Sequence, residues 1–222
     1  MAVPTVGYIL TVLIAYLLGS IPTGFLVAKA RGVDIRRLGS GNIGATNVFR
    51  ILGKPAGIFV LLADAAKGWL AVFVVAELVA GWFYPAAGPL AREWFAIGAG
   101  VAAILGHNYT CWLYFKGGKG IATSAGVLLA LVPWPLLIIL GIWIVVFALS
   151  RYVSLASISA AFALPFAAWS VEESTTITLV TAALAALAIY KHRANIQRLV
   201  KGTENRISLR RPLSSDAPKP TA

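Results

Sequence analysis

The sequence predicts an all-α integral membrane protein with about seven transmembrane helices. Of its 222 residues, 59% are hydrophobic and only 12% are charged, against about 45–50% and about 25% in an average soluble domain. The charged residues are clustered, which leaves uncharged runs of about 20 residues, the length that spans a bilayer as a helix. These runs are continuous rather than alternating, so a membrane β-barrel is disfavoured and the backbone pairs its polar groups within each segment.

The uncharged runs place the seven helices over residues 3–28, 55–80, 94–115, 121–131, 135–149, 153–169 and 176–190. The fourth and fifth runs are short and meet at Val132-Pro133-Trp134-Pro135, so a re-entrant pair and one long bent helix are alternatives. No basic segment precedes the first run, so we interpret it as a retained helix rather than a cleaved signal. Residues 1–208 are predicted to form a single transmembrane domain, and residues 209–222 a disordered tail.

The basic residues predict an orientation in the membrane. With seven spans, 17 of the 19 Lys and Arg residues fall on one side, Arg92 alone lies on the other, and Lys67 lies within a span. The positive-inside rule makes the basic side cytoplasmic, with the N-terminus outside and the C-terminus inside. A net charge of +11 then indicates an anionic membrane face and anionic substrates, and nucleic acid is not an expected partner.

Cysteine and histidine are too scarce for two kinds of scaffold. The chain has one cysteine, Cys111, so it cannot form an intrachain disulfide. Two histidines and that thiol are too few for a credible zinc site. We therefore expect no metal site and no cofactor.

The first of three polar clusters covers residues 39–50 and joins two membrane helices. Three glycines alternate here with short hydrogen-bonding side chains, a composition suited to a loop that folds closely around a polyanion. The candidate ligand groups are Ser40, Asn42, Thr46 and Arg50. The cluster contains a literal G-x-G-x-x-G, which is weak because no strand precedes it. A flexible linker is the alternative.

The second cluster, residues 115–120, leads directly into the fourth apolar run. The backbone N–H groups of Gly117, Gly118 and Gly120 can converge on an anion, Lys119 adds charge, and the helix N-terminus adds its dipole. The segment is not a Walker A loop, because a glycine stands where that motif needs Ser or Thr. The alternative is that its lysines only anchor a helix pair to lipid headgroups.

The third cluster, residues 191–204, follows the last apolar run. If that helix continues past Tyr190, His192 and Asn195 are three residues apart and share a face. A histidine at a wet interface can exchange a proton near neutral pH. A basic juxtamembrane anchor is the alternative interpretation for the segment taken alone.

Smaller polar features lie within the spans. Asp64 and Lys67 are three residues apart and are costly in a membrane unless paired, so we expect first a structural ion pair and second a substrate contact. Ser154 and Ser157 either help helices to pack or contact a ligand. His107 is expected to be a core histidine.

Together these segments resemble the bacterial acyl-phosphate:glycerol-3-phosphate acyltransferase (PlsY) family over about residues 15–206. The segments that carry the resemblance are Gly19-Ser20-Ile21-Pro22, 39–50, Asp64-Ala65-Ala66-Lys67-Gly68, 115–120 with Ala122-Thr123, 152–157 and 191–204. One departure is Thr110, where such proteins usually carry proline. The resemblance implies a multi-pass enzyme of the bacterial inner membrane with its active site on the cytoplasmic face. It implies transfer of an acyl group from acyl phosphate to the sn-1 hydroxyl of glycerol 3-phosphate, giving lysophosphatidic acid and phosphate. The implied partners are both substrates, membrane lipid and the soluble enzyme that supplies acyl phosphate.

The residues fit that chemistry. Because an acyl phosphate has a good leaving group, positioning and charge stabilisation suffice without a covalent intermediate. We place Ser40 with His192 and Asn195 in the catalytic group, as a hydrogen-bonding residue rather than a nucleophile.

Other residues have binding or supporting roles in this hypothesis. Arg50 offers a planar fork for one phosphate, while Lys119 and the glycine amides hold the other phosphate or the oxyanion. Ser157 is a further substrate-binding candidate. Glu204 braces the third cluster by pairing with a cation, and His192 either orients the acceptor or removes its proton.

Two other functions compete with acyl transfer. Seven helices with a buried Asp64 and Lys67 also suit a small transporter of an anionic solute, although the polar loops lie on one side and we find no internal repeat. A lipid phosphatase would release phosphate from acyl phosphate without any acceptor. Formation of lysophosphatidic acid from acyl phosphate distinguishes the three.

Overall fold

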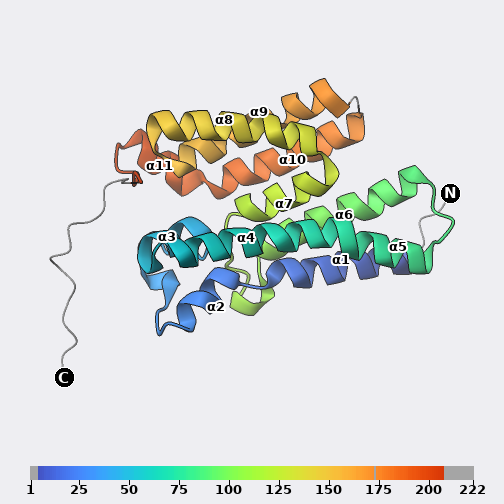
Figure 1. Cartoon of the computed structure of the whole chain (residues 1–222), viewed down its shortest axis with the longest axis horizontal. Coiled ribbons are helices and arrows are strands. Elements are labelled where there is room, and N and C mark those ends of the chain that lie inside the picture. The colour runs from blue at the N-terminus through green and yellow to red at the C-terminus, as the bar shows by residue number, and fades with distance from the viewer. Residues whose placement is uncertain (1–4, 173, 208–222) are drawn as a thin grey trace.

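The computed structural model describes residues 5–172 and 174–207, and every regular element in those ranges is helical (Figure 1). The elements before the central loop are α1 (Thr5–Ser20), α2 (Thr23–Lys29), η1 (Ile35–Arg37), α3 (Ala45–Leu52), α4 (Lys54–Leu70), η2 (Ala71–Ala76), α5 (Glu77–Phe83) and α6 (Pro89–Asn108). The remaining elements are η3 (Cys111–Leu113), α7 (Ile121–Leu131), α8 (Pro133–Ser150), α9 (Val153–Glu172), α10 (Thr175–Lys191) and α11 (Arg193–Val200). The predicted all-α fold is confirmed. The predicted tail, 209–222, lies outside the described residues.

The long helices run lengthwise beside one another in two groups (Figure 1). One group contains α1, α4 and α6, and the other contains α8, α9 and α10, with the short α7 between them. The most extensive packing pairs α1 with α6, α4 with α7, and α9 with both α8 and α10. The short elements α2, α3 and α11 lie at one end of the bundle, which we call the basic end because it holds most of the Lys and Arg residues.

Among the described residues, four helical stretches are long and apolar enough to cross a membrane: Thr5–Lys29, Lys54–Phe83, Pro133–Ser150 and Val153–Val171. The bent pair formed by α10 and α11 would be a fifth. The 11 residues of α7 extend only about 16 Å, roughly half of the hydrocarbon core. The count of seven spans and the orientation of the termini therefore stay predictions.

The structure corrects the predicted spans in three places. The first run is broken at Ile21-Pro22 between α1 and α2, because proline lacks an N–H and restricts the residue before it. The third run was expected over 94–115, but α6 covers Pro89–Asn108 and an irregular segment follows. The alternative of one long bent helix at residues 121–149 is wrong, because α8 runs back from the end of α7 (Figure 1).

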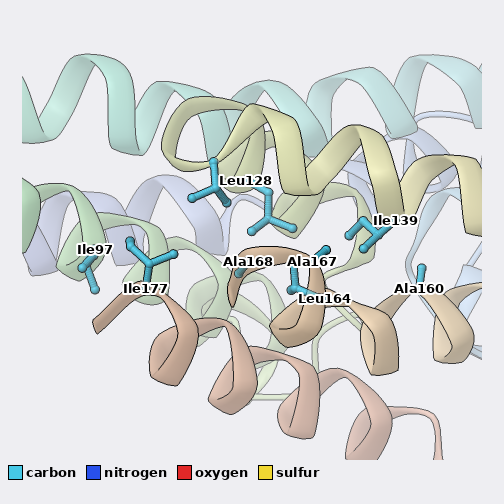
Figure 2. Packing of buried hydrophobic residues seen from close by; sticks show 9 residues of the cluster. Ile97, Leu128, Ile139, Ala160, Leu164, Ala167, Ala168 and Ile177 are labelled. Carbon is cyan, nitrogen blue, oxygen red and sulfur yellow. The ribbon is translucent and has the colours of Figure 1, made fainter. Parts of the chain in front are cut away.

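The two groups of helices are joined by an apolar core around α7 (Figure 2). Ile97 of α6, Leu128 of α7, Ile139 of α8, Leu164 of α9 and Ile177 of α10 are all buried in one cluster. Because α7 contacts both groups, it fixes how they sit relative to each other. The segment that leads into α7 is the second polar cluster, so this core also positions the predicted site.

Candidate active site

The N-terminal loop, residues 38–50, is organised by one buried side chain. The Nδ2 group of Asn47 donates to the carbonyl oxygens of Leu38 at 3.0 Å and Asn42 at 2.9 Å, and its Oδ1 accepts from the amide of Ser40 at 3.0 Å. Asn47 is 2% exposed. It therefore holds the loop in shape from within, a structural role that the sequence analysis did not assign to it.

The predicted ligand groups of this loop differ in what they can offer. Ser40 and Arg50 are exposed and Thr46 is half-buried, so their polar atoms can meet a ligand from solution. Asn42 instead accepts a hydrogen bond from the amide of Gly44 at 2.8 Å. With that oxygen engaged in a turn, Nδ2 is the group that Asn42 can offer to a substrate.

The glycine–lysine loop, residues 116–120, is held by the end of α6. The amide of Gly117 donates to the carbonyl of Asn108 at 3.2 Å, and that of Gly118 donates to the carbonyl of His107 at 3.0 Å. We expected these two amides to bind phosphate, and the structure corrects this because both are already paired. The anion-binding groups that remain are Lys119, the amide of Gly120 and the first N–H groups of α7, which have no partner within the helix.

Glycine is required in this loop for close packing. A Cβ atom on Gly118 would overlap Nε2 of the His107 imidazole. Gly120 has φ +79° and precedes α7, and a Cβ there would lie 2.6 Å from Oδ1 of Asn108. Both positions bring the backbone against the end of α6, and Gly120 also adopts a conformation that L side chains rarely take.

A hydrogen-bonded cluster joins the glycine–lysine loop to α9, α11 and the segment after α11. Nζ of Lys119 donates to Oδ1 of Asn195 at 2.5 Å, and Nδ2 of Asn195 donates to Oε1 of Glu204 at 2.8 Å. Glu204 also accepts from Arg198 at 2.7 Å and from Ser154 at 3.0 Å. We call these five residues the Glu204 cluster. Glu204 thus pairs with a nearby cation, as the hypothesis for that residue expected.

The surroundings shift the pKa values of two members of this cluster. Burial, against an opposing effect of Glu204 and together with the positive charges of Arg198 and Arg50, lowers the pKa of Lys119 to about 8. Burial acts to raise the pKa of Glu204, but its hydrogen bonds, first from Asn195, lower it overall. At neutral pH the cluster therefore holds a carboxylate and an ammonium group.

His192 lies at the break between α10 and α11, where the chain bends by 57°. The expected continuation of the last helix past Tyr190 therefore ends at Lys191, and Asn195 belongs to a new helix. Nδ1 of His192 lies 2.8 Å from the carbonyl oxygen of Ala188. Since a carbonyl can only accept, Nδ1 carries the hydrogen.

The protonation state of His192 follows from its surroundings. Burial and the charge of Lys119 lower the pKa of His192 to about 4. The imidazole is therefore neutral at pH 7, with a lone pair on Nε2. This differs from the expectation of proton exchange near neutral pH.

The fold joins the second and third predicted polar clusters and places Arg50 of the first near them. Lys119 of the second cluster contacts Asn195 of the third, and the charge of Arg50 in the first cluster acts on Lys119. Ser157 lies three residues from Ser154 on α9, and its Oγ accepts from Nε1 of Trp143 at 3.1 Å. It is therefore one helical turn from the Glu204 cluster.

A buried polar group lies behind the glycine–lysine loop. Nζ of Lys67 is 2.9 Å from Oδ1 of Asp64, so these two side chains form a buried ion pair, and its structural role stays a prediction. His107 is buried as expected, and its Nδ1 lies 3.7 Å from the same carboxylate oxygen. Within the described parts of the chain, no group of three or more His, Cys, Asp or Glu residues is placed to hold a metal ion.

Comparison with known sequences gives a consistent family match. A sequence model described as glycerol-3-phosphate acyltransferase matches residues 9–202. A glycerol-3-phosphate acyltransferase of Geotalea daltonii is 49% identical over 86% of this chain and 93% of its own length. One from Endomicrobium trichonymphae is 45% identical over 90% of this chain and 96% of its own length.

Two solved structures share the fold. The crystal structure of PlsY (YgiH), an integral membrane glycerol 3-phosphate acyltransferase, in its glycerol 3-phosphate form has a TM-score of 0.78 at 40% identity, covering 90% of this chain and 96% of that one. The lysophosphatidic acid form has a TM-score of 0.77 at 39% identity, covering 90% and 95%. The family match over residues 9–202 covers the first two polar clusters and most of the third.

Proposed function

The chain belongs to the glycerol-3-phosphate acyltransferase family, and from that premise we propose the donor, the site and the roles of its residues. It acylates glycerol 3-phosphate for phospholipid synthesis in a membrane. The proposed donor is an acyl phosphate, and the products are lysophosphatidic acid and phosphate. The acceptor hydroxyl forms a bond to the acyl carbon, the carbon–oxygen bond to the donor phosphate breaks, and the hydroxyl proton leaves with that phosphate.

The observation that carries the proposal is the contact between Lys119 and Asn195, with Arg50 close enough for its charge to act on Lys119. Both substrates carry phosphate, so the site needs two cationic elements. A lysine held by an amide and an arginine from a separate loop supply them. Their convergence at one site supports a reaction between two anionic substrates.

His192 and Asn195 are proposed to hold the acceptor. With Nδ1 bonded to Ala188, the free lone pair of His192 is on Nε2 and can accept a hydrogen bond from the attacking hydroxyl. A histidine whose pKa is about 4 is a weak general base at pH 7. We therefore assign it to orientation, with the departing phosphate as the proton acceptor.

The donor is proposed to lie against the N-terminal loop and the start of α7. The guanidinium of Arg50 can bind a phosphate with two parallel hydrogen bonds, and Ser40, Asn42 and Thr46 add single ones. The first N–H groups of α7 suit the oxyanion that develops on the acyl carbonyl. Ser157, buried one helical turn from the Glu204 cluster, is proposed as a further substrate contact.

We place the enzyme in the bacterial inner membrane with this site facing the cytoplasm. The support is the distribution of 17 of the 19 basic residues on one side of the predicted spans. A soluble acceptor then arrives from the cytoplasm while the fatty chain stays in lipid. A soluble enzyme that produces acyl phosphate is the expected supplier of the donor.

The test is lysophosphatidic acid formation by the purified full-length protein in detergent. Acyl phosphate, acyl-CoA and acyl-carrier protein are compared as donors at equal acyl-chain length, each with and without glycerol 3-phosphate. We expect product only from acyl phosphate. Product from acyl-CoA but not from acyl phosphate would overturn the proposed donor. Phosphate release in the absence of glycerol 3-phosphate would favour a phosphatase.

A further inference from the structure

Three ionisable side chains inside the bundle take no part in the proposed reaction. Asp64 and Lys67 on α4 and His107 on α6 are 2%, 4% and 5% exposed. Ionisable groups inside a membrane protein are costly and rare, and they commonly mark a functional element. Their surroundings indicate what this group does.

One side of the group reaches the break between α1 and α2. Nζ of Lys67 donates to the carbonyl oxygen of Ile21 at 3.0 Å and lies 2.9 Å from Oδ1 of Asp64. That oxygen is 3.7 Å from Nδ1 of His107. One edge of the imidazole therefore faces an ion pair on α4, and that ion pair is itself tied to the break between α1 and α2 through the Ile21 carbonyl.

The other edge of the imidazole supports the glycine–lysine loop. A Cβ atom on Gly118 would overlap Nε2 of His107, so the loop backbone lies directly against the ring. The Gly118 amide also donates to the His107 carbonyl at 3.0 Å. His107 thus contacts the loop through both its ring and its backbone, one residue before Lys119.

We infer that Asp64, Lys67 and His107 are positioning residues that set the place of the glycine–lysine loop so that Lys119 reaches Asn195. Because glycines have no side chains to pack, the position of this loop depends on the surface behind it. A displacement of about 1 Å at a catalytic group can lower the rate roughly 10²-fold. The inference rests on the proposed function in one respect, namely that Lys119 serves acyl transfer.

The test replaces His107 by leucine, an apolar side chain of similar size, in the full-length protein. We expect His107→Leu to lower kcat roughly 10²-fold. The same change in a Lys119→Met background is expected to lower kcat no further, because both substitutions remove the same contact. Thr181→Val is the matched control: this buried hydroxyl bonds only within α10, to the carbonyls of Ile177 and Thr178, and kcat should not change.

Two outcomes of these assays would overturn the inference. One is a His107→Leu enzyme with the parental kcat, and the other is a pair of effects that multiply in the double variant. If His107→Leu does not fold, Asp64→Asn combined with Lys67→Met gives the same comparison, because it removes both charges together and leaves no lone buried charge. We expect that double variant to have a lower kcat, and the addition of Lys119→Met to it to lower kcat no further.

A second measurement does not depend on activity. Cys111, the chain's one cysteine, is partly buried in the segment between α6 and the loop. Its rate of labelling by a maleimide should rise several-fold in His107→Leu and stay unchanged in Thr181→Val. An unchanged rate in His107→Leu would contradict the positioning role, even in a protein that showed no acyl transfer at all.

Discussion

The two loops that border the proposed substrate site are stabilised in opposite ways. The N-terminal loop is held from within by the buried amide of Asn47, and it leaves Ser40 and Arg50 exposed. The glycine–lysine loop is held from behind by the carbonyls at the end of α6, and Lys119 is its one member in the Glu204 cluster. The first loop therefore offers several adaptable groups, whereas the second fixes one.

This difference predicts two kinds of kinetic damage. Substitutions in the N-terminal loop remove one of several contacts to a substrate and should chiefly raise KM. Substitutions in the glycine–lysine loop displace or remove a charge aimed at the reacting groups, so they should chiefly lower kcat. The following predictions test that division, beginning with the largest expected effect.

Removal of the lysine that reaches Asn195 should have the largest effect. Lys119→Ala leaves the Glu204 cluster without its ammonium group, and we expect kcat to fall roughly 10²–10³-fold. Lys116→Ala, an exposed lysine of the same loop, is the control and should retain most activity. Equal losses in both variants would mean that the loop supplies only general charge.

Gly118→Ala should come next, with a loss of roughly 10²-fold in kcat, because a methyl group there displaces the loop from His107. Gly81→Ala on α5, where an added Cβ has nothing within 4 Å, should leave both kcat and KM unchanged. Steady-state kinetics with both substrates measure the difference. A Gly118→Ala variant that changes only KM would show that the glycine–lysine loop contributes to substrate binding in the same way as the N-terminal loop.

Arg50→Lys retains the positive charge but loses the planar guanidinium that can donate two parallel hydrogen bonds to a phosphate. Losing a charge-assisted hydrogen bond costs about 1.5–3 kcal/mol, which corresponds to roughly 10–100-fold in affinity. We expect this loss of affinity to appear as a higher KM for the acyl phosphate donor, with kcat nearly preserved. Lys54→Ala at the exposed start of α4 is the control, and a matching loss there would indicate electrostatic attraction in place of phosphate recognition.

Asn47→Ala should release the N-terminal loop without touching a substrate. The carbonyls of Ile35, Leu38 and Asn42 and the amide of Ser40 each lose a hydrogen bond. We therefore expect a lower thermal midpoint, and a roughly tenfold rise in KM as the loop loses its shape, which corresponds to about 1.4 kcal/mol. Thr181→Val serves again as the buried control. A fall in kcat at constant KM would contradict the division between the loops.

The sequence allowed the fold class and the three polar clusters to be predicted, because long apolar runs and local groups of polar residues are visible without tertiary structure. It did not reveal how the clusters are held. Asn47 is one of two asparagines in its cluster, and only its contacts to Leu38 and Ser40 distinguish it. The amides of Gly117 and Gly118 were assigned to phosphate because sequence cannot tell that α6 ends at Asn108, where its carbonyls accept them.

The smallest predicted effect concerns the pH dependence of activity and compares two titrating groups of the site, Lys119 and His192. Lys119, with its pKa lowered to about 8, acts as a cation, so activity should be lost as pH rises through that value. Between pH 7 and pH 8.5 we expect kcat/KM, which reports the free enzyme, to fall roughly fourfold. In the pH profile of kcat, this basic limb should lie at a higher pH, because a bound phosphate favours the charged form of Lys119.

His192 should leave no acidic limb above about pH 5, because its pKa is lowered to about 4. His192→Gln keeps a hydrogen-bonding group and should therefore mainly raise KM for glycerol 3-phosphate, with the pH profile unchanged. If His192 is instead the general base, the same substitution lowers kcat roughly 10²–10⁴-fold at constant KM. Asn195→Ala is the reference variant, since an amide does not titrate and its loss should alter acceptor binding in either case. A His192→Gln enzyme with normal KM and greatly reduced kcat would show that the histidine, and not the departing phosphate, takes the proton.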